Sequence, residues 1–149
     1  MISDCSGNYY TCETYIFNTF GYAFGESSFL FIKGGKAVGF IGVICSCKNK
    51  SLHVYSLCTD KLYRTDNIGT MLIEKVILYA NKNKYKTISF TLNNSNRRIY
   101  PLFSSLAKRL NKQIKKTNRY EEATFLEITY TIYLENPEQS ENRETEEIY

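Results

Sequence analysis

The stretch of sequence that decides the fold is Asp60-Lys61-Leu62-Tyr63-Arg64-Thr65-Asp66-Asn67-Ile68-Gly69-Thr70-Met71-Leu72. A β-rich segment ends here, and a short polar loop opens a segment in which apolar residues have helical spacing. The first amides of a helix have no partner within the helix and carry the positive end of its dipole. Arg64 adds a cation, Gly69 allows a ligand to approach the backbone, and Thr70 adds a hydroxyl. The stretch therefore predicts an anion-binding turn, with an ordinary strand-to-helix turn as the alternative.

Upstream of this stretch, β-rich runs alternate with turn signals. Gly34-Gly35 marks a tight hairpin. The aromatic residues between positions 9 and 20 have a spacing that a helix allows. We therefore predict a helix over residues 9–20, followed by an antiparallel meander of three strands at residues 28–33, 37–47 and 52–60.

Downstream, the period of the apolar residues changes. It predicts a buried helix over residues 68–83 and a second helix over residues 99–110, with Pro101 in the first turn of the latter. Strands are expected at residues 86–92 and 124–134, with a short strand at residues 113–117. Because the strands at 52–60 and 86–92 flank a helix, they should run parallel. The fold class is therefore α/β.

The 149 residues suffice for one domain with a real core. Residues 135–149 hold six glutamates and one arginine, a net charge of −5, so the total of +4 leaves +9 on residues 1–134. A body this basic attracts anions such as nucleic acid, acidic membranes or a polyphosphate cofactor. We predict one domain over residues 1–134 and an acidic, disordered tail over residues 135–149, which either solubilises the protein or competes with the anion.

Several classes of protein are disfavoured by composition. The longest apolar run, residues 38–45, is far shorter than the roughly 20 residues of a membrane span. The amino terminus lacks a basic stretch followed by an apolar run, and the five cysteines are odd in number and scattered, unlike a secreted disulfide framework. We therefore expect a cytoplasmic protein with reduced thiols and no membrane partner.

The loop and the order of elements together resemble the GCN5-related N-acetyltransferase (GNAT) superfamily. Its pyrophosphate-binding signature, Gln/Arg-x-x-Gly-x-Gly/Ala, reads Arg64-Thr65-Asp66-Asn67-Ile68-Gly69 here, with Asn67 in place of the middle glycine. Asparagine is the non-glycine residue that best tolerates a positive φ, so the loop shape is expected to survive. The resemblance covers about residues 28–110 and implies a GNAT-like fold.

Within the superfamily, the segments at residues 35–40, 52–60 and 102–109 are similar to diaminobutyrate acetyltransferase. That family has a tryptophan where Tyr55 stands. It also has a strand and a helix ahead of the region that matches residues 6–20, and we expect the chain to begin after both. A missing first strand leaves a sheet edge, so we also expect a homodimer that covers it.

The resemblance implies an acetyl-CoA-dependent N-acetyltransferase that moves an acyl group to a primary amine, acting on a small molecule such as a diamino acid. Backbone groups of one strand would hold the pantetheine arm and the thioester carbonyl, the loop would hold the pyrophosphate, and an asparagine after the next strand would hold an amide of the arm. The residues so implied are Leu57, Thr59, Arg64, Thr65, Asp66, Asn67, Ile68, Gly69, Thr70 and Asn96. Many members have a tyrosine seven residues after this asparagine that protonates the thiolate, but Phe103 has no hydroxyl.

His53 is the candidate general base that removes a proton from the amine. It is the only histidine, its unperturbed pKa near 6.5 suits the task, and several family members place a glutamate base six residues before the position of Thr59. Strand alternation predicts that His53, Tyr55, Leu57 and Thr59 share one face. Tyr55 is the candidate for lining the pocket or relaying a proton. A histidine without a role and a core tyrosine are the alternatives.

Other residues support weaker interpretations. Glu13 and Glu26 are the candidates for binding a cationic amine, since acids are scarce before Asp60. The set of Cys45, Cys47, His53 and Cys58 matches no zinc spacing, so buried thiols are favoured and no metal is expected. The basic run at residues 108–120 is either a solvated face or a site for phosphates of RNA or of coenzyme A.

Two alternative functions stay open. The protein acetylates an amine of a protein or of an aminoacyl-tRNA, which the basic body would help to recruit, or it is a catalytically inactive GNAT-like binding module. Asn67, Phe103 and the missing first elements favour the inactive module, while His53 and the pair of Arg64 and Gly69 favour an enzyme.

Overall fold

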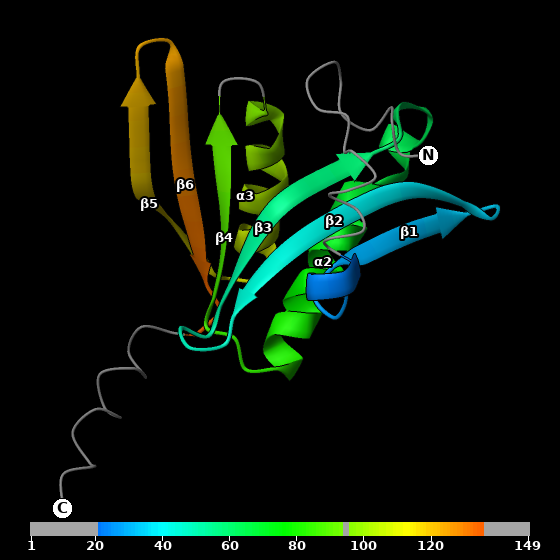
Figure 1. Ribbon diagram of the computed structural model, residues 1–149, viewed down its shortest axis with the longest axis horizontal. Coiled ribbons are helices and arrows are strands. Elements are labelled where there is room, and N and C mark those ends of the chain that lie inside the picture. The colour runs from blue at the N-terminus through cyan, green and yellow to red at the C-terminus, as the bar shows by residue number, and fades with distance from the viewer. Residues whose placement is uncertain (1–20, 94–95, 136–149) are drawn as a thin grey trace, which may run out of the picture.

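The computed structural model describes residues 21–93 and 96–135. Its strands form one six-stranded sheet in the order β1-β2-β3-β4-β6-β5, with two longer helices, α2 and α3, packed on it (Figure 1). The strands are β1 (Phe29–Lys33), β2 (Lys36–Ser46), β3 (Ser51–Thr59), β4 (Thr87–Asn93), β5 (Gln113–Glu122) and β6 (Phe125–Tyr133). The helices are α2 (Ile68–Lys82) and α3 (Tyr100–Arg109), preceded by the 3-10 turns η1 (Lys61–Asp66) and η2 (Arg97–Ile99).

The predicted α/β architecture is confirmed. The bounds of the three strands of the meander, the two helices, β4 and β6 differ from the predicted ones by at most one residue at either end. β3 and β4 run parallel, as predicted, and every other pair of neighbouring strands is antiparallel. The predicted length of the strand at residues 113–117 is wrong, because β5 continues to Glu122 along β6. The predicted helix at residues 9–20 and most of the acidic tail lie outside the described residues.

The core lies between the sheet and the two helices. One side of α2 is buried, as its spacing of apolar residues predicts. Sheet and helix approach each other closely at Gly39, where a Cβ would stand 2.5 Å from the Cγ2 of Ile68. On α3, the ring of Phe103 is fully buried and stacks on Phe90 of β4, with the ring centroids 3.9 Å apart. None of the described helices is both long and apolar enough to cross a membrane.

Both helices cover the same face of the sheet. Gly39 of β2 meets α2, and Phe90 of β4 meets α3. Residues that lie opposite each other on paired strands share a face, and the pairs that join β2 to β3 and β3 to β4 place Gly39 and Phe90 on one side. We call this side the helix-covered face and the other side the opposite face.

Candidate active site

The two parallel strands at the centre of the sheet pair over their first halves only. Their pairs end at Val54 and Phe90, although both strands continue beyond these residues. On its other edge, β4 stays paired with β6 to its last residue. Figure 1 shows β3 and β4 diverging. We call the diverging segments, residues 55–59 of β3 and 91–93 of β4, the splay.

A β-bulge in β3 begins where the splay begins. Gly42 lies opposite Ser56, whereas Val43 lies opposite Val54, so Tyr55 is an extra residue in β3. Such a bulge bends its strand and increases the local twist. The bulge therefore accounts for the divergence of β3 from β4 at this point.

The bulge also overturns the prediction that His53, Tyr55, Leu57 and Thr59 share one face. Leu57 and Thr59 lie opposite residues of β2 that face the helices, so their side chains are on the helix-covered face. His53, before the bulge, lies on the opposite face. Tyr55 sits in the bulge itself and is 57% exposed, so it is not a core residue.

Backbone groups of β3 point toward the splay. The Asp60 amide donates to the Val38 carbonyl at 2.9 Å, which fixes the phase of the β2–β3 ladder. Hydrogen-bonded and non-hydrogen-bonded positions alternate in an antiparallel pair. Leu57 and Thr59 therefore occupy non-hydrogen-bonded positions, and their N–H and C=O groups point away from β2 toward the side on which β4 diverges.

The loop between β3 and α2 has the conformation of an anion site. Asn67 adopts φ 57° and ψ 23°, the left-handed conformation that the sequence predicted it would tolerate. The first amide to bond within α2 is that of Met71, which donates to the Asn67 carbonyl at 3.1 Å. The three preceding amides, of residues 68–70, therefore point out of the amino end of the helix. These amides lie beside the end of β3, at the mouth of the splay.

Gly69 faces the ends of two other elements. A Cβ at this position would stand 3.5 Å from the Cδ1 of Leu102 in α3 and 3.9 Å from the Oγ1 of Thr59 in β3. Both are ordinary contact distances, so the protein itself leaves room for a methyl group there. A need for glycine at position 69 would thus come from a ligand rather than from the fold.

Lys33, which the sequence did not point to, is part of this loop's surroundings. Its Nζ lies 2.6 Å from the Asp66 carboxylate and 5.1 Å from the centre of the Tyr63 ring. The hydrogen bond to Asp66 and its negative charge raise the pKa of Lys33. Asp66 is the one carboxylate in the predicted pyrophosphate loop, and Lys33 neutralises it. The two residues are 33 positions apart, so no local pattern could have found the pair.

Asn96 is held by a reciprocal pair of hydrogen bonds. The Asn93 amide donates to its side-chain oxygen at 2.7 Å, and its own amide donates to the Asn93 side-chain oxygen at 3.2 Å. The side-chain NH₂ group of Asn96 is the part that a ligand amide would use. The pair ties the end of β4 to the start of η2.

His53 lies on the opposite face at the narrow end of the splay. It pairs with Ser89 of β4, one residue before the last pair of the two strands. Its Nδ1 is 2.9 Å from the Ser89 Oγ, and Ser89 donates its only proton to the Leu52 carbonyl at 3.3 Å. When the Ser89 hydroxyl donates to the Leu52 carbonyl, it accepts from the histidine, and the proton is then on Nδ1 and a lone pair on Nε2. Burial lowers the pKa of His53, so the ring is neutral at neutral pH.

The remaining predicted residues lie elsewhere. Burial, with the nearby Cys45 and Glu26, raises the pKa of Tyr79. Glu26 therefore lies beside the second half of α2, about 15 Å along the helix from the loop, and the structure does not bring it to the splay. Glu13 lies outside the described residues. Phe103 is buried under Phe90 and offers no acid to the site.

No metal centre forms in the part of the chain that the structure describes. No three His, Cys, Asp or Glu side chains gather there. Cys45 lies opposite Leu52, on the helix-covered face, whereas His53 is on the opposite face. The sheet thus separates Cys45 from His53. The expectation of buried thiols is wrong for Cys47, which is exposed, and Cys45 and Cys58 are only partly buried.

The protein is an α/β protein whose mixed sheet splays beside the amino end of a helix, an arrangement with room for an anionic ligand at that helix end. The chain belongs to the GNAT acetyltransferase family, because the model of the acetyltransferase (GNAT) domain matches residues 18–106. The protein is therefore an N-acetyltransferase, and acetyl-CoA is the co-substrate of its family. The family that the sequence resembled is confirmed.

Solved structures share the fold at low sequence identity. Diaminobutyrate acetyltransferase EctA from Paenibacillus lautus is 20% identical, with a TM-score of 0.71 over 80% of this chain and 76% of that one. The ribosomal-protein-S18-alanine N-acetyltransferase from Escherichia coli is 18% identical, with a TM-score of 0.63 over 89% and 81%. The aminoglycoside 6'-N-acetyltransferase from Enterococcus faecium is 15% identical, with a TM-score of 0.59 over 74% of each chain. No curated protein sequence matches the chain.

Proposed function

We propose that the protein transfers the acetyl group of acetyl-CoA to a primary amine of a small diamino acid, directly and within the splay. The observation that carries this proposal is the position of the splay between two chemically different sites. The anion-binding end of α2 lies on the helix-covered face, and a neutral histidine lies on the opposite face. Donor and acceptor would thus reach the same point from opposite sides of the sheet.

The donor side is supported by the loop and by β3. The outward-pointing amides of residues 68–70, with Arg64, would bind the pyrophosphate through the helix dipole and direct hydrogen bonds. The N–H and C=O groups of Leu57 and Thr59 would bind the pantetheine arm as a neighbouring strand would, and the Asn96 amide would bind it from the other side. Acetyl-CoA supplies a thioester carbonyl that an amine nitrogen can attack.

The acceptor side is supported by His53. Its Nε2 lone pair would take the proton of the incoming ammonium, and Ser89 would hold the ring in the required tautomer. The amine nitrogen then forms a bond to the carbonyl carbon as the C–S bond breaks, and the thiol is released. Tyr55, exposed in the bulge at the narrow end of the splay, would line the acceptor's path.

A small diamino acid is the acceptor class that the fold likeness favours. The structure from Paenibacillus lautus is described in complex with its substrate L-2,4-diaminobutyric acid and coenzyme A. The enzyme from Escherichia coli instead acts on the alanine of a ribosomal protein, so the fold serves both classes of amine. The acceptor therefore has to be decided by experiment.

The test is acetyl-CoA-dependent thiol release with matched amines. L-2,4-Diaminobutyrate and a short peptide that begins with alanine would be compared, with wild-type protein and a His53→Gln variant. We expect release with diaminobutyrate in the wild type alone. Thiol release with the peptide only would indicate that the acceptor is an amine of a protein. Acetyl-CoA binding without release for any amine would make the protein an inactive binding module.

Two further expectations belong to this proposal. The described cysteines, Cys45, Cys47 and Cys58, are free thiols, which agrees with a reducing cytoplasm. β1 is an edge strand among the described residues and exposes Leu30 and Ile32, which favours a homodimer through this edge. Sedimentation of wild type and Ile32→Lys would decide the oligomeric state.

A further inference from the structure

Lysine side chains gather at the end of the sheet where β3, β4 and β5 begin. They come from the turn between β2 and β3, from the end of α2 and its connection to β4, and from the start of β5. Figure 1 shows the first two of these segments beside the end of β6. We call this surface the lysine end, and its residues are Lys48, Lys50, Lys82, Lys84, Lys86, Lys112 and Lys115. All of them except Lys112 are exposed.

Backbone contacts place these segments side by side, with the end of β6 between them. The Lys86 amide donates to the Lys50 carbonyl at 2.7 Å, and the Leu134 amide donates to the Lys86 carbonyl at 2.9 Å. On the other side of β6, Tyr133 pairs with the first residue of β5. Neighbouring strands are about 4.8 Å apart, so the backbone of Lys50, two strands away, is about 10 Å from β6. The chain therefore leaves β6 between two groups of lysines.

The lysine end keeps most of its positive charge within the described residues. Lys86 forms an ion pair with Glu135, the second residue after β6, with the Nζ and the carboxylate oxygen 3.8 Å apart. Lys50 and Lys115 stand over tyrosine rings, with their Nζ atoms 5.9 and 5.7 Å from the ring centres. Glu26, near the second half of α2, adds a second carboxylate on the side of β1. The lysines outnumber these two carboxylates, so the surface attracts a further anion.

The next residues of the chain supply such an anion. Residues 136–149 contain Glu138, Glu141, Glu144, Glu146 and Glu147 against Arg143, a net charge of −4. Because this segment is covalently attached, its effective concentration at the lysine end is on the order of millimolar. Lysine ammonium groups are point charges on flexible stems, so they pair with carboxylates without a fixed geometry. The ion pair of Glu135 with Lys86 is the first contact of this kind along the chain.

The lysine end is far from the loop that we assign to acetyl-CoA. β3 runs from one to the other, and its nine residues span about 26 Å. An extended chain spans at most about 3.6 Å per residue, so Glu138 and Glu141 lie at most roughly 22 Å from Glu135 along the backbone. These two glutamates are thus within easy reach of the lysine end, whereas the loop at residues 64–70 lies beyond their backbone reach.

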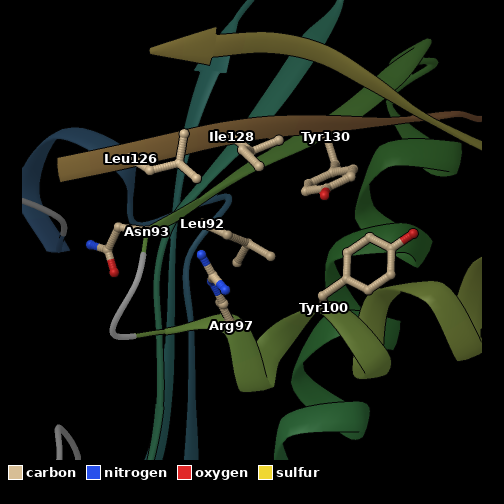
Figure 2. A pocket seen from close by; sticks show the side chains of 7 residues that line it. All are labelled: Leu92, Asn93, Arg97, Tyr100, Leu126, Ile128 and Tyr130. Carbon is tan, nitrogen blue, oxygen red and sulfur yellow. The ribbon is translucent and has the colours of Figure 1, made fainter. Parts of the chain in front are cut away.

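The lysine end is also separate from the cavity shown in Figure 2. This cavity has a volume of about 380 Å³ and includes Leu92 and Asn93 among its lining residues. Both residues belong to the splay, at the opposite end of β4 from Lys86. The cavity therefore belongs with the acetyl-transfer site, and the lysine end does not.

We propose that the lysine end binds the chain's own acidic segment, residues 136–149, and that this contact keeps other polyanions away from the lysines. The contact is intramolecular, because the segment leaves β6 between the two groups of lysines. It does not depend on the proposed acetyl transfer, because no residue of the splay or of the loop contributes to it.

The test compares the full-length wild type with a tail-neutral variant, in which the glutamates of residues 136–149 are replaced by glutamine. At low salt, ¹H–¹⁵N NMR should show different shifts in the two proteins for the amides of residues 48–50, 84–86 and 112–115. The two sets of shifts should coincide at about 0.5 M salt, because salt screens exposed charges. Inorganic tripolyphosphate, titrated as a probe of these amides, should bind about tenfold more tightly to the tail-neutral variant.

Lys48→Gln with Lys86→Gln is the informative variant of the lysine end, and Lys36→Gln with Lys75→Gln is its matched control. All of these lysines are exposed, but Lys36 lies at the opposite end of β2 and Lys75 within α2. We expect the amides of residues 138–147 to lose about half or more of their salt-dependent shift in the first variant and to keep it in the control. Unchanged thermal unfolding would show that both variants fold.

Four results would overturn the proposal. Equal shifts of the lysine-end amides in wild type and the tail-neutral variant at low salt would show that there is no contact. An equal effect of the two lysine pairs would show a diffuse attraction to charge. Shift differences confined to residues 64–70 would place the acidic segment on the phosphate loop. Shift differences that grow with protein concentration would show that the segment binds a second copy.

Discussion

The ammonium nitrogen of Lys33, at the end of β1, lies 2.6 Å from the carboxylate of Asp66 in the loop before α2. An anion-binding loop that contains a carboxylate repels the ligand that it should hold. Lys33, which belongs to β1, offsets the negative charge of Asp66. We therefore expect the pair to matter for the proposed pyrophosphate ligand more than for the fold, since exposed ion pairs add little to stability.

Lys33→Met should weaken acetyl-CoA binding by roughly two- to fivefold, because the uncompensated Asp66 then opposes the pyrophosphate. Acetyl-pantetheine, which has no pyrophosphate, should bind the variant and the wild type alike. Calorimetry with both donors measures this difference. Lys33→Met combined with Asp66→Asn should recover the affinity, and Lys36→Met, at the start of β2, is the control of equal charge change. A loss of acetyl-pantetheine affinity in Lys33→Met would contradict an electrostatic role.

Gly69→Ala should fold normally and yet bind acetyl-CoA at least tenfold more weakly. The protein leaves ordinary contact distances around a Cβ at this position, so only a ligand lying against the backbone would meet the methyl group. Urea unfolding and calorimetry on the same variant separate the two effects. Equal affinity in variant and wild type would place the pyrophosphate away from this turn.

Gly39→Ala, in contrast to Gly69→Ala, is expected to lower the stability of the fold. A Cβ there would stand 2.5 Å from the Cγ2 of Ile68, so the start of α2 has to shift, at a cost of about 1–3 kcal/mol in stability. Urea unfolding should detect the loss directly. A variant as stable as the wild type would mean that α2 is not fixed against β2 at this point.

His53→Gln should lower kcat by roughly a hundredfold or more and leave the KM for acetyl-CoA nearly unchanged. The reason is that His53 lies on the face opposite the loop. Because burial lowers its pKa, the acid limb of kcat/KM in the wild type should fall below pH 6.5. Rate measurements from pH 5 to 9 test both statements, and Ser89→Ala should change the pH profile without removing activity.

The lowered pKa of His53 also makes the stability of the fold depend on pH. The folded pKa of His53 is below the unfolded value near 6.5, so below that pH the unfolded chain binds more protons. The contribution of neutral His53 is complete above pH 6.5 and is lost as the pH falls from 6.5 through the folded pKa. Thermal unfolding at pH 7.5 and 5.5 should therefore show a larger drop for wild type than for His53→Gln. Equal drops would contradict a buried neutral ring.

Asn67→Gly should keep both stability and acetyl-CoA affinity, whereas Asn67→Val should lose roughly 1–2 kcal/mol of stability. The residue has φ 57°, a conformation that glycine adopts freely and a β-branched residue resists. Denaturant unfolding of both variants, with calorimetry, checks the pair. A stable valine variant would mean that the turn can rearrange.

The order of the elements could be predicted from the sequence because each long element has an apolar face of its own period. The length of β5 could not, since most of its side chains are exposed and charged or polar, and the strand exists through its pairing with β6. The basic run that includes Arg109 and Arg119 shows a similar limit. Arg109 pairs with Glu74 and Arg119 with Glu121, so the run is divided between two elements and partly neutralised.

The candidate site was predictable only in part. The loop could be found because its chemistry lies in consecutive residues, from Arg64 to Thr70. The face of the sheet on which each side chain of β3 lies could not be predicted, because the bulge at Tyr55 depends on how β3 pairs with β2. Strand alternation assumes a regular ladder, and one extra residue reverses every side chain that follows it.

The extra residue Tyr55 bends β3 away from β4 and so opens the splay, which connects the two faces of the sheet. Deleting it would restore regular pairing with Leu57 and Thr59 still opposite the same residues of β2, and it would remove the bend that separates β3 from β4. Substitutions within β3 would leave this arrangement in place. A change in the length of β3, rather than in its composition, is therefore expected to close the splay in a protein that still folds.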